Sequence, residues 1–111
     1  MKEADVILTA IPQANGQLKN RPAIYLREMP PFKDALICGI STQVQHEVKG
    51  FDELVSPLDP DFALSGLVQE SLIRLGFLAV IPRNKILGTI GSIAKSRHDR
   101  LLQNLSQYLL K

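Results

Sequence analysis

The sequence has little cysteine and no tryptophan, and both absences narrow what the chain can be. Of its 111 residues, one is cysteine, Cys38. A single cysteine excludes an intramolecular disulfide and a zinc site of paired cysteines, and it is compatible with a reducing compartment. Because Cys38 lies inside the apolar segment ALICGI, we expect it to be a small, buried side chain.

Motifs for metal ions and for nucleotide phosphates are also missing. The two histidines, His46 and His98, are far apart and belong to no HExxH motif, so we expect each to be a solvated surface residue. The segment LGTIGS at 87–92 has two glycines three residues apart, but it lacks the lysine and the strand–loop–helix context of a P-loop. The sequence therefore predicts no metal and no cofactor.

The chain also lacks long apolar runs. No run of about 18 apolar residues occurs, so we expect no membrane-spanning helix. The first residues, MKEADVILTAIP, place acidic residues before a short apolar run and do not have the pattern of a signal peptide. Together with the lone cysteine, these features lead us to expect a cytoplasmic protein without a membrane partner.

Composition is typical of one globular domain that spans residues 1–111. Hydrophobic residues make up 45% of the chain and charged residues 22%, which is too apolar for a disordered protein. The formal net charge is +2. This slight excess of positive charge permits a nucleic-acid partner but does not by itself indicate one.

Most of the chain has the pattern of β-strands. Asn15-Gly16 favours a turn between the first two strands, and Pro22, which lacks an N–H, suits the start of the second. Pro30 and Pro31 are expected to end that strand. We expect strands at residues 5–11, 22–29, 35–42, 67–75 and 77–82, a weaker one at 51–56, and a short, bent one at 86–93. Residues 43–50 are predicted to be a loop, and 57–66 to be irregular with one helical turn after Asp59.

The end of the chain changes to a helical period, which predicts a helix over 97–110. Ser96 is the expected N-cap, and Asp99 occupies the acidic position of a capping box. Strands followed by one amphipathic helix indicate an α+β fold, in which the helix covers a curled sheet. The apolar residues at helical spacing are Leu101, Leu102, Leu105, Tyr108 and Leu109.

Arginines and hydroxyls near the expected strand ends are the main candidates for chemistry. Arg21 precedes the second strand, Ser41 and Thr42 end the third, and Ser71 and Arg74 share one segment. A guanidinium offers a fixed fork of donors and hydroxyls add further donors, so such residues could surround a phosphate. RNA cleavage by its own 2′-OH needs only orientation, proton transfer and charge stabilisation from the protein. An alternative, that Arg21 is a solvated strand-end residue, stays open.

The order of several segments resembles the PemK/MazF toxins of toxin–antitoxin systems, from about residue 4 to the end. The resemblance implies a small, curled, SH3-like β-barrel of the CcdB/MazF type with a C-terminal helix, which forms a homodimer. The segments that carry it are ADVILTAIPQANG at 4–16, NRPAIYL at 20–26, ICGISTQ at 37–43, SGLVQESLIRLGFLAVIP at 65–82 and GTIGSIAKSRHDRLLQNLSQYLL at 88–110.

The resemblance also implies an activity and its residues. It implies a toxin that cleaves single-stranded RNA without metal, by attack of the 2′-OH, and that an acidic antitoxin silences. Arg21, Thr42 and Arg74 match the family's catalytic positions; because arginine is a poor base at its usual pKa, charge stabilisation is the role we expect of Arg21. The candidate RNA-binding residues are Lys19, Ser41, Gln43, His46 and Ser71.

Two other functions remain open on the same fold. A gyrase-poisoning toxin is disfavoured, because that activity depends on a tryptophan-containing C-terminal end and this chain has no tryptophan. A catalytically silent barrel that serves as a binding or regulatory module is the second alternative. Family members often carry an acid two residues after the strand arginine, whereas this chain has Gly76 there. With two tyrosines and no tryptophan, the chain also has few platforms for stacking bases.

Overall fold

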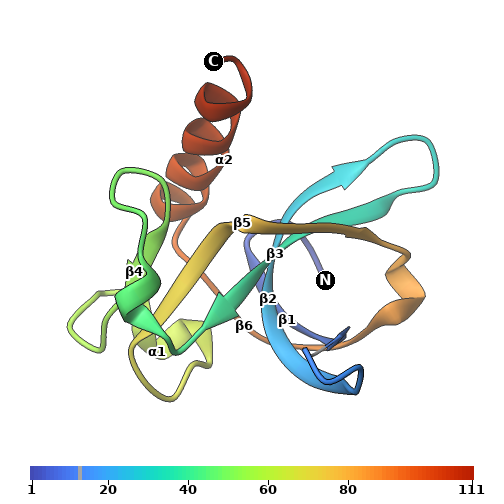
Figure 1. Cartoon of the computed structure of the whole chain (residues 1–111), viewed down its shortest axis with the longest axis horizontal. Helices are drawn as coiled ribbons and strands as arrows, with labels where there is room; N and C mark the ends of the chain where they lie inside the picture. The colour runs from blue at the N-terminus through green and yellow to red at the C-terminus, as the bar shows by residue number, and fades with distance from the viewer. Residues whose placement is uncertain (13) are drawn as a thin grey trace.

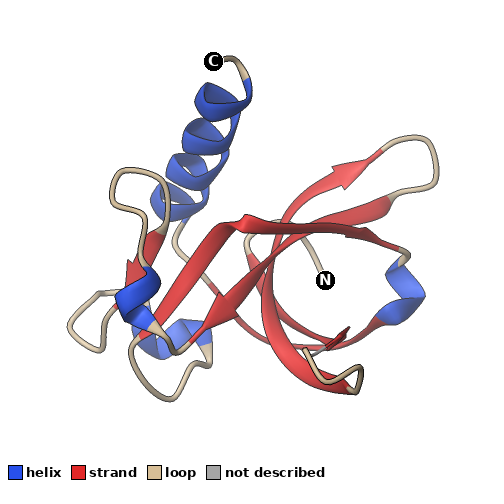
Figure 2. Cartoon of the chain, in the orientation of Figure 1, coloured by secondary structure: helices blue, strands red, loops and turns tan. Residues whose placement is uncertain are grey.

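A curled antiparallel sheet and one long C-terminal helix form the fold, which confirms the predicted α+β class (Figure 1). Our computed structural model of the chain describes residues 1–12 and 14–111. Within them, six strands form a half-barrel in the order β4-β5-β3-β2-β1-β6 (Figure 2). The strands are β1 (Asp5–Pro12), β2 (Leu18–Met29), β3 (Asp34–Ser41), β4 (Glu53–Val55), β5 (Ser71–Ile81) and β6 (Ile86–Ser92). The helices are η1 (Val44–His46), α1 (Phe62–Ser65), η2 (Arg83–Lys85) and α2 (Lys95–Leu109).

The curl of the sheet buries side chains on both of its faces. Successive residues of a strand point to opposite faces, so Val6 joins one apolar cluster and its neighbour Ile7 joins the other. The larger cluster lies between the sheet and α2 and includes Leu101. Cys38 is fully buried in this larger cluster, as predicted, and burial raises the pKa of its thiol.

Strand β2 begins four residues earlier than predicted. It starts at Leu18, so Pro22 lies inside the strand, opposite Leu8 of β1. The proline is tolerated there because β3 pairs with β2 only from Ala23 onward, which leaves one edge of β2 unpaired at Pro22. Arg21 therefore lies within the paired part of β2, opposite Thr9, and not before the start of the strand.

Strand β5 is a single bent strand, although the sequence predicted two strands at 67–75 and 77–82. Cys38 pairs with Leu78, but the next residue of β3, Gly39, pairs with Arg74, so residues 75–77 have no partners in β3. Such a bulge bends the strand without ending it, and glycine at position 76 suits the bend. Residues 67–70, which were predicted to be strand, lie before β5 begins.

The shorter elements agree with the sequence in kind. The Asn15-Gly16 turn is present, with a positive φ of 85° at Gly16. The predicted helical turn after Asp59 is α1, the strand candidate at 51–56 shortens to β4, and the loop at 43–50 contains η1. In the described residues, no helix is both long enough and apolar enough to cross a membrane.

Helix α2 begins two residues earlier than predicted, and its cap is different. Ala94 is the N-cap and Ser96 lies inside the helix, while Asp99 pairs with Lys95 at 2.9 Å. The expectation that His98 is solvated was wrong. Its ring is buried, and Nε2 donates to the carbonyl oxygen of Leu26 at 2.7 Å. His98 is buried because it shares the sheet-facing side of the helix with Leu101.

Candidate functional site

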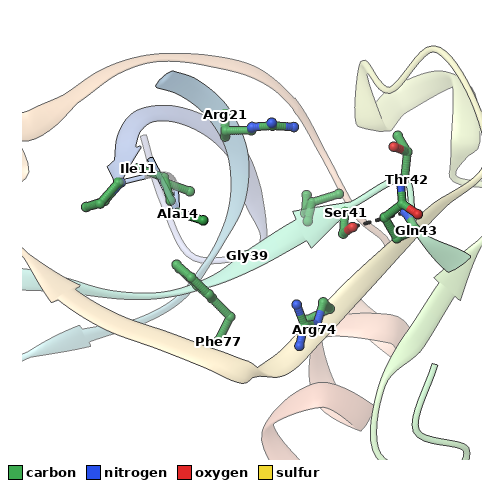
Figure 3. A pocket seen from close by; sticks show the side chains of 11 residues that line it. Ile11, Ala14, Arg21, Gly39, Ser41, Thr42, Gln43, Arg74 and Phe77 are labelled. Carbon is green, nitrogen blue, oxygen red and sulfur yellow. Dashed lines mark hydrogen bonds between the residues drawn. The ribbon is translucent and has the colours of Figure 1, made fainter. Parts of the chain in front are cut away.

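A pocket of about 300 Å³ opens where the end of β3 meets β1, β2 and β5 (Figure 3). We call it the arginine pocket, because it contains Arg21 from β2 and Arg74 from β5. Figure 3 draws these two side chains on either side of the end of β3. Its described lining residues are Ile11, Pro12, Ala14, Arg21, Gly39, Ile40, Ser41, Thr42, Gln43, Arg74 and Phe77.

Strand pairing places both arginines in this pocket. Arg21 lies opposite Thr9 in the β1–β2 ladder, and alternation along β2 puts it on the same face as Ala23. Arg74 lies opposite Gly39, the first residue of β3 after the pairing with β5 jumps across the bulge. Residues more than fifty positions apart in the sequence thus reach one pocket through two strands that both flank β3.

The end of β3 supplies hydroxyl and amide groups between the two arginines. Thr42 is exposed at the pocket, directly after the last residue of the strand. Ser41 Oγ accepts a hydrogen bond from the backbone N–H of Gln43 at 3.0 Å, which shapes the turn after the strand. The side-chain oxygen of Gln43 accepts a hydrogen bond from Gln45 at 2.7 Å. The same pocket therefore combines two guanidinium groups with the hydroxyls of Ser41 and Thr42 and the side-chain amide of Gln43.

The charge of the arginine pocket is positive. Two of its eleven described lining residues are arginines, and none of the eleven is an aspartate or a glutamate. Arg74 is half-buried, and across residues 1–12 and 14–111 it forms no ion pair with a carboxylate. A half-buried cavity with two guanidinium groups and a hydroxyl favours an anion such as a phosphate, because charge-assisted hydrogen bonds are stronger than neutral ones.

The structure brings five of the eight residues predicted for the site into this pocket: Arg21, Ser41, Thr42, Gln43 and Arg74. Lys19 and His46 are exposed but do not line it. Ser71 lies elsewhere, 2% exposed, and its hydroxyl donates to the carbonyl of Gln69 at 2.9 Å. The reason is geometric, because residues three apart on a regular strand segment, such as Ser71 and Arg74, point to opposite faces.

Sequence reasoning missed a second group of charged residues, which surrounds Arg97 of α2. All five N–H donors of this guanidinium are used: two bonds go to Asp61, and one each to Asp59, Glu53 and the carbonyl of Leu54. Asp61 also accepts from the backbone N–H of Ala94, at the start of α2. These bonds join α2 to β4 and to the segment before α1, so the cluster is structural.

Electrostatics in the Arg97 cluster follow from these contacts. The hydrogen bond from the Arg97 guanidinium holds the pKa of Asp61 below its usual range, against the opposing effect of burial. Burial works to lower the pKa of Arg97, but the bonds and charges of Asp61, Asp59 and Glu53 outweigh it, so the pKa is raised. The only sequence signal for this cluster was the closely spaced pair of acids in SPLDPDF, and nothing local linked it to Arg97.

No metal-binding group is evident in the described part of the chain: residues 1–12 and 14–111 contain no set of three or more histidine, cysteine, aspartate or glutamate side chains arranged to hold an ion. In comparisons with known proteins, no protein-family model matches this chain, and no curated protein matches it either.

Proposed function

We propose that this chain is the toxin of a type II toxin–antitoxin system, a metal-independent endoribonuclease that cleaves single-stranded RNA. One observation carries the proposal: Arg21, Thr42 and Arg74, from three different segments, line the same pocket. They are also the residues that the resemblance to PemK/MazF toxins selects. The half-barrel with a C-terminal helix is compatible with a barrel of the CcdB/MazF type, which we propose as its fold family.

The proposed reaction uses a nucleophile that the RNA carries. The ribose 2′-oxygen attacks the adjacent phosphorus while the bond from phosphorus to the 5′-oxygen breaks. The 2′-OH loses its proton, the leaving 5′-oxygen gains one, and the products are a 2′,3′-cyclic phosphate and a 5′-OH. Arg21 and Arg74 stabilise the charge that develops on the phosphate oxygens, and the Thr42 hydroxyl donates to one of them.

The same pocket suggests the partners. We propose that RNA lies across a groove shared by two copies of the chain, in a homodimer. An acidic segment of the antitoxin would compete for the arginine pocket, because its carboxylates satisfy the same guanidinium groups as the phosphate. Lys19, which is exposed on β2 two residues before Arg21, would extend that basic surface.

Alanine substitution of the pocket arginines tests the proposal. Loss of one preorganised donor to the transition state costs roughly 100-fold to 1,000-fold in rate. We therefore expect Arg21→Ala and Arg74→Ala to keep the wild-type melting temperature and to cleave RNA at least about 100-fold more slowly. Arg21→Lys should also lose most activity, because an ammonium cannot reproduce the two-pronged contact.

The matched control is Arg27→Ala, on the same strand as Arg21. Arg27 is largely exposed, pairs with Glu3 at 3.6 Å, and lies outside the pocket, so its removal should leave cleavage unchanged. Cleavage should also survive EDTA. Near wild-type cleavage by Arg21→Ala, or loss of activity on chelation with recovery on adding one divalent ion, would refute the mechanism.

The second candidate is a module that binds RNA without cleaving it. It is favoured by one observation: none of the eleven described lining residues of the arginine pocket is a histidine or a carboxylate that could act as a general base. Gly76, at the position where family members often carry an acid, cannot supply one. Wild-type protein that binds single-stranded RNA, loses binding on Arg21→Ala and yields no cyclic phosphate would favour this candidate.

A further inference from the structure

One wall of the arginine pocket is an aromatic ring that the proposed cleavage chemistry does not use. Phe77 lies on β5, between β4 and β3 in the sheet order, and it lines the pocket with 39% of its surface exposed. Figure 3 shows its side chain extending along β3 towards Ala14 and Ile11, away from Arg74. A large apolar side chain that remains partly exposed inside a cavity is available to a ligand.

The bulge of β5 explains why Phe77 and Arg74 share a pocket. They are three residues apart, so on a regular strand they would point to opposite faces. Residues 75–77 have no partners in β3, and Leu75 turns into the main core, where it is 1% exposed. The bulge therefore changes the direction of the Phe77 side chain, so that a cation and an aromatic ring line the same pocket.

The ring of Phe77 packs against Gly39 of β3. A Cβ atom added at position 39 would lie 3.0 Å from Cδ1 of Phe77 and 3.3 Å from Cγ, so the ring rests directly against the backbone of β3. The pairing of Gly39 with both Ala23 and Arg74 makes that backbone part of the central sheet. The position of Phe77 is thus set by packing before any ligand arrives.

We propose that an unpaired nucleobase stacks on Phe77 while the phosphate of the same nucleotide contacts Arg21 and Arg74. This inference rests on the proposed function, because it names how the RNA is held at that site. Ile11 and Ile40 add apolar surface to the pocket, and Figure 3 shows the Phe77 side chain directed towards Ile11 and away from Arg74. The pocket thus offers an apolar part for the flat face of a base and a cationic part for the phosphate of one nucleotide. At about 300 Å³, the pocket has room for one such unit and not for a folded segment.

The test compares two chains of equal charge that cannot be cleaved. One is a short 2′-O-methyl oligoadenylate, and the other is a 2′-O-methyl abasic ribose-phosphate chain of the same length. Binding is measured by fluorescence anisotropy at one salt concentration. Stacking of one base on an aromatic side chain increases the binding affinity. We therefore expect the wild-type protein to bind the oligoadenylate at least about 5-fold more tightly than the abasic chain.

Three variants separate stacking from folding and charge. Phe77→Leu should reduce that preference to less than about 2-fold and leave affinity for the abasic chain unchanged, because both arginines remain. Phe77→Tyr keeps a ring and should keep the preference. The control is Phe32→Leu, which removes a ring that is 80% exposed in the β2–β3 connection and is not among the described lining residues of the pocket. It should match the wild type, and melting temperatures report folding.

The outcomes distinguish this inference from the proposed function. If the wild type cleaves RNA but Phe77→Leu keeps the full preference for bases, stacking on Phe77 is refuted and the endoribonuclease stands. If the preference exists and depends on Phe77 while no RNA is cleaved, the base site stands and the endoribonuclease is refuted. Equal affinity of the wild type for the two chains refutes the base site outright.

Discussion

Replacing Arg97 with methionine should destabilise the fold more than any other single change of a charged residue. Methionine keeps an unbranched stem but removes five hydrogen bonds and the cation that faces Asp61, Asp59 and Glu53. The Arg97 side chain is 7% exposed and that of Asp61 is 5% exposed. The change therefore leaves a buried carboxylate without its counter-charge.

The expected loss of stability follows from the burial of this ion pair. Removing one partner of a buried ion pair costs about 3–5 kcal/mol. For a domain of this size, each kcal/mol lowers the melting temperature by about 4 °C, so Arg97→Met should melt about 12–20 °C below the wild type. Thermal unfolding followed by circular dichroism measures this directly.

The matched control is Arg100→Met, one turn along the same helix. Arg100 pairs with the same Glu53 at 2.9 Å, but its side chain is 51% exposed. An exposed pair contributes about 1 kcal/mol or less, so this variant should melt within about 4 °C of the wild type. Similar losses for the two variants would show that burial of the Arg97 cluster does not set the energy.

The pH dependence gives a second check with a definite sign. In the wild type, Arg97 holds the pKa of Asp61 below its usual value of about 3.9, so the stability that this pair contributes is present above about pH 4 and is lost as the pH falls further. In Arg97→Met, the buried Asp61 lacks a cation, its pKa should rise, and acid should neutralise it. The penalty should therefore be smaller at about pH 4.5 than at about pH 7. A penalty that is constant or grows on acidification would refute the reasoning.

Two further predictions concern packing. Gly91→Ala should destabilise the fold by about 2 kcal/mol or more, because an added Cβ atom would collide with the backbone of Leu64 and Ser65 in α1. Gly88→Ala is the control: a Cβ atom there meets nothing within 4 Å, so its melting temperature should stay close to that of the wild type. Cys38 should resist a thiol reagent in the folded protein and react promptly in guanidinium, because burial raises the pKa of its thiol and blocks access; rapid modification of the native protein would contradict this placement.

Local patterns in the sequence were enough to predict the kind of most elements. Short segments rich in branched apolar residues predicted β1 and β3, and the glycine of Asn15-Gly16 predicted a turn with positive φ. The apolar spacing of Leu101 and Leu105 predicted a C-terminal helix. These features follow from interactions between residues close in sequence, or from the period of one element. The α+β class follows from their order along the chain.

Only the tertiary structure decided which of the candidate residues meet. Arg21 and Arg74 line one pocket because β2 and β5 both pair with β3, and the bulge at 75–77 directs Phe77 into the same space. Ser71 was also a candidate by sequence, but it points to the opposite face of β5 from Arg74 and is buried opposite Val55 of β4. Strand neighbours and bulges depend on the whole sheet, so no local pattern contains them.

The cap of α2 and the exposure of His98 were predicted wrongly for the same reason, because both depend on contacts between distant parts of the chain. Ser96 and Asp99 have the local pattern of a capping box, but the start of the helix is held instead by Asp61, which is more than thirty residues away and accepts from the N–H of Ala94. His98 and Arg97 look like surface residues in a polar stretch, yet packing against β2 and the segment before α1 buries both. The sequence by itself determined the kind and the order of most elements. Burial, strand pairing and long-range hydrogen bonding, which need the folded chain, decided how the helix is held and which residues line the arginine pocket.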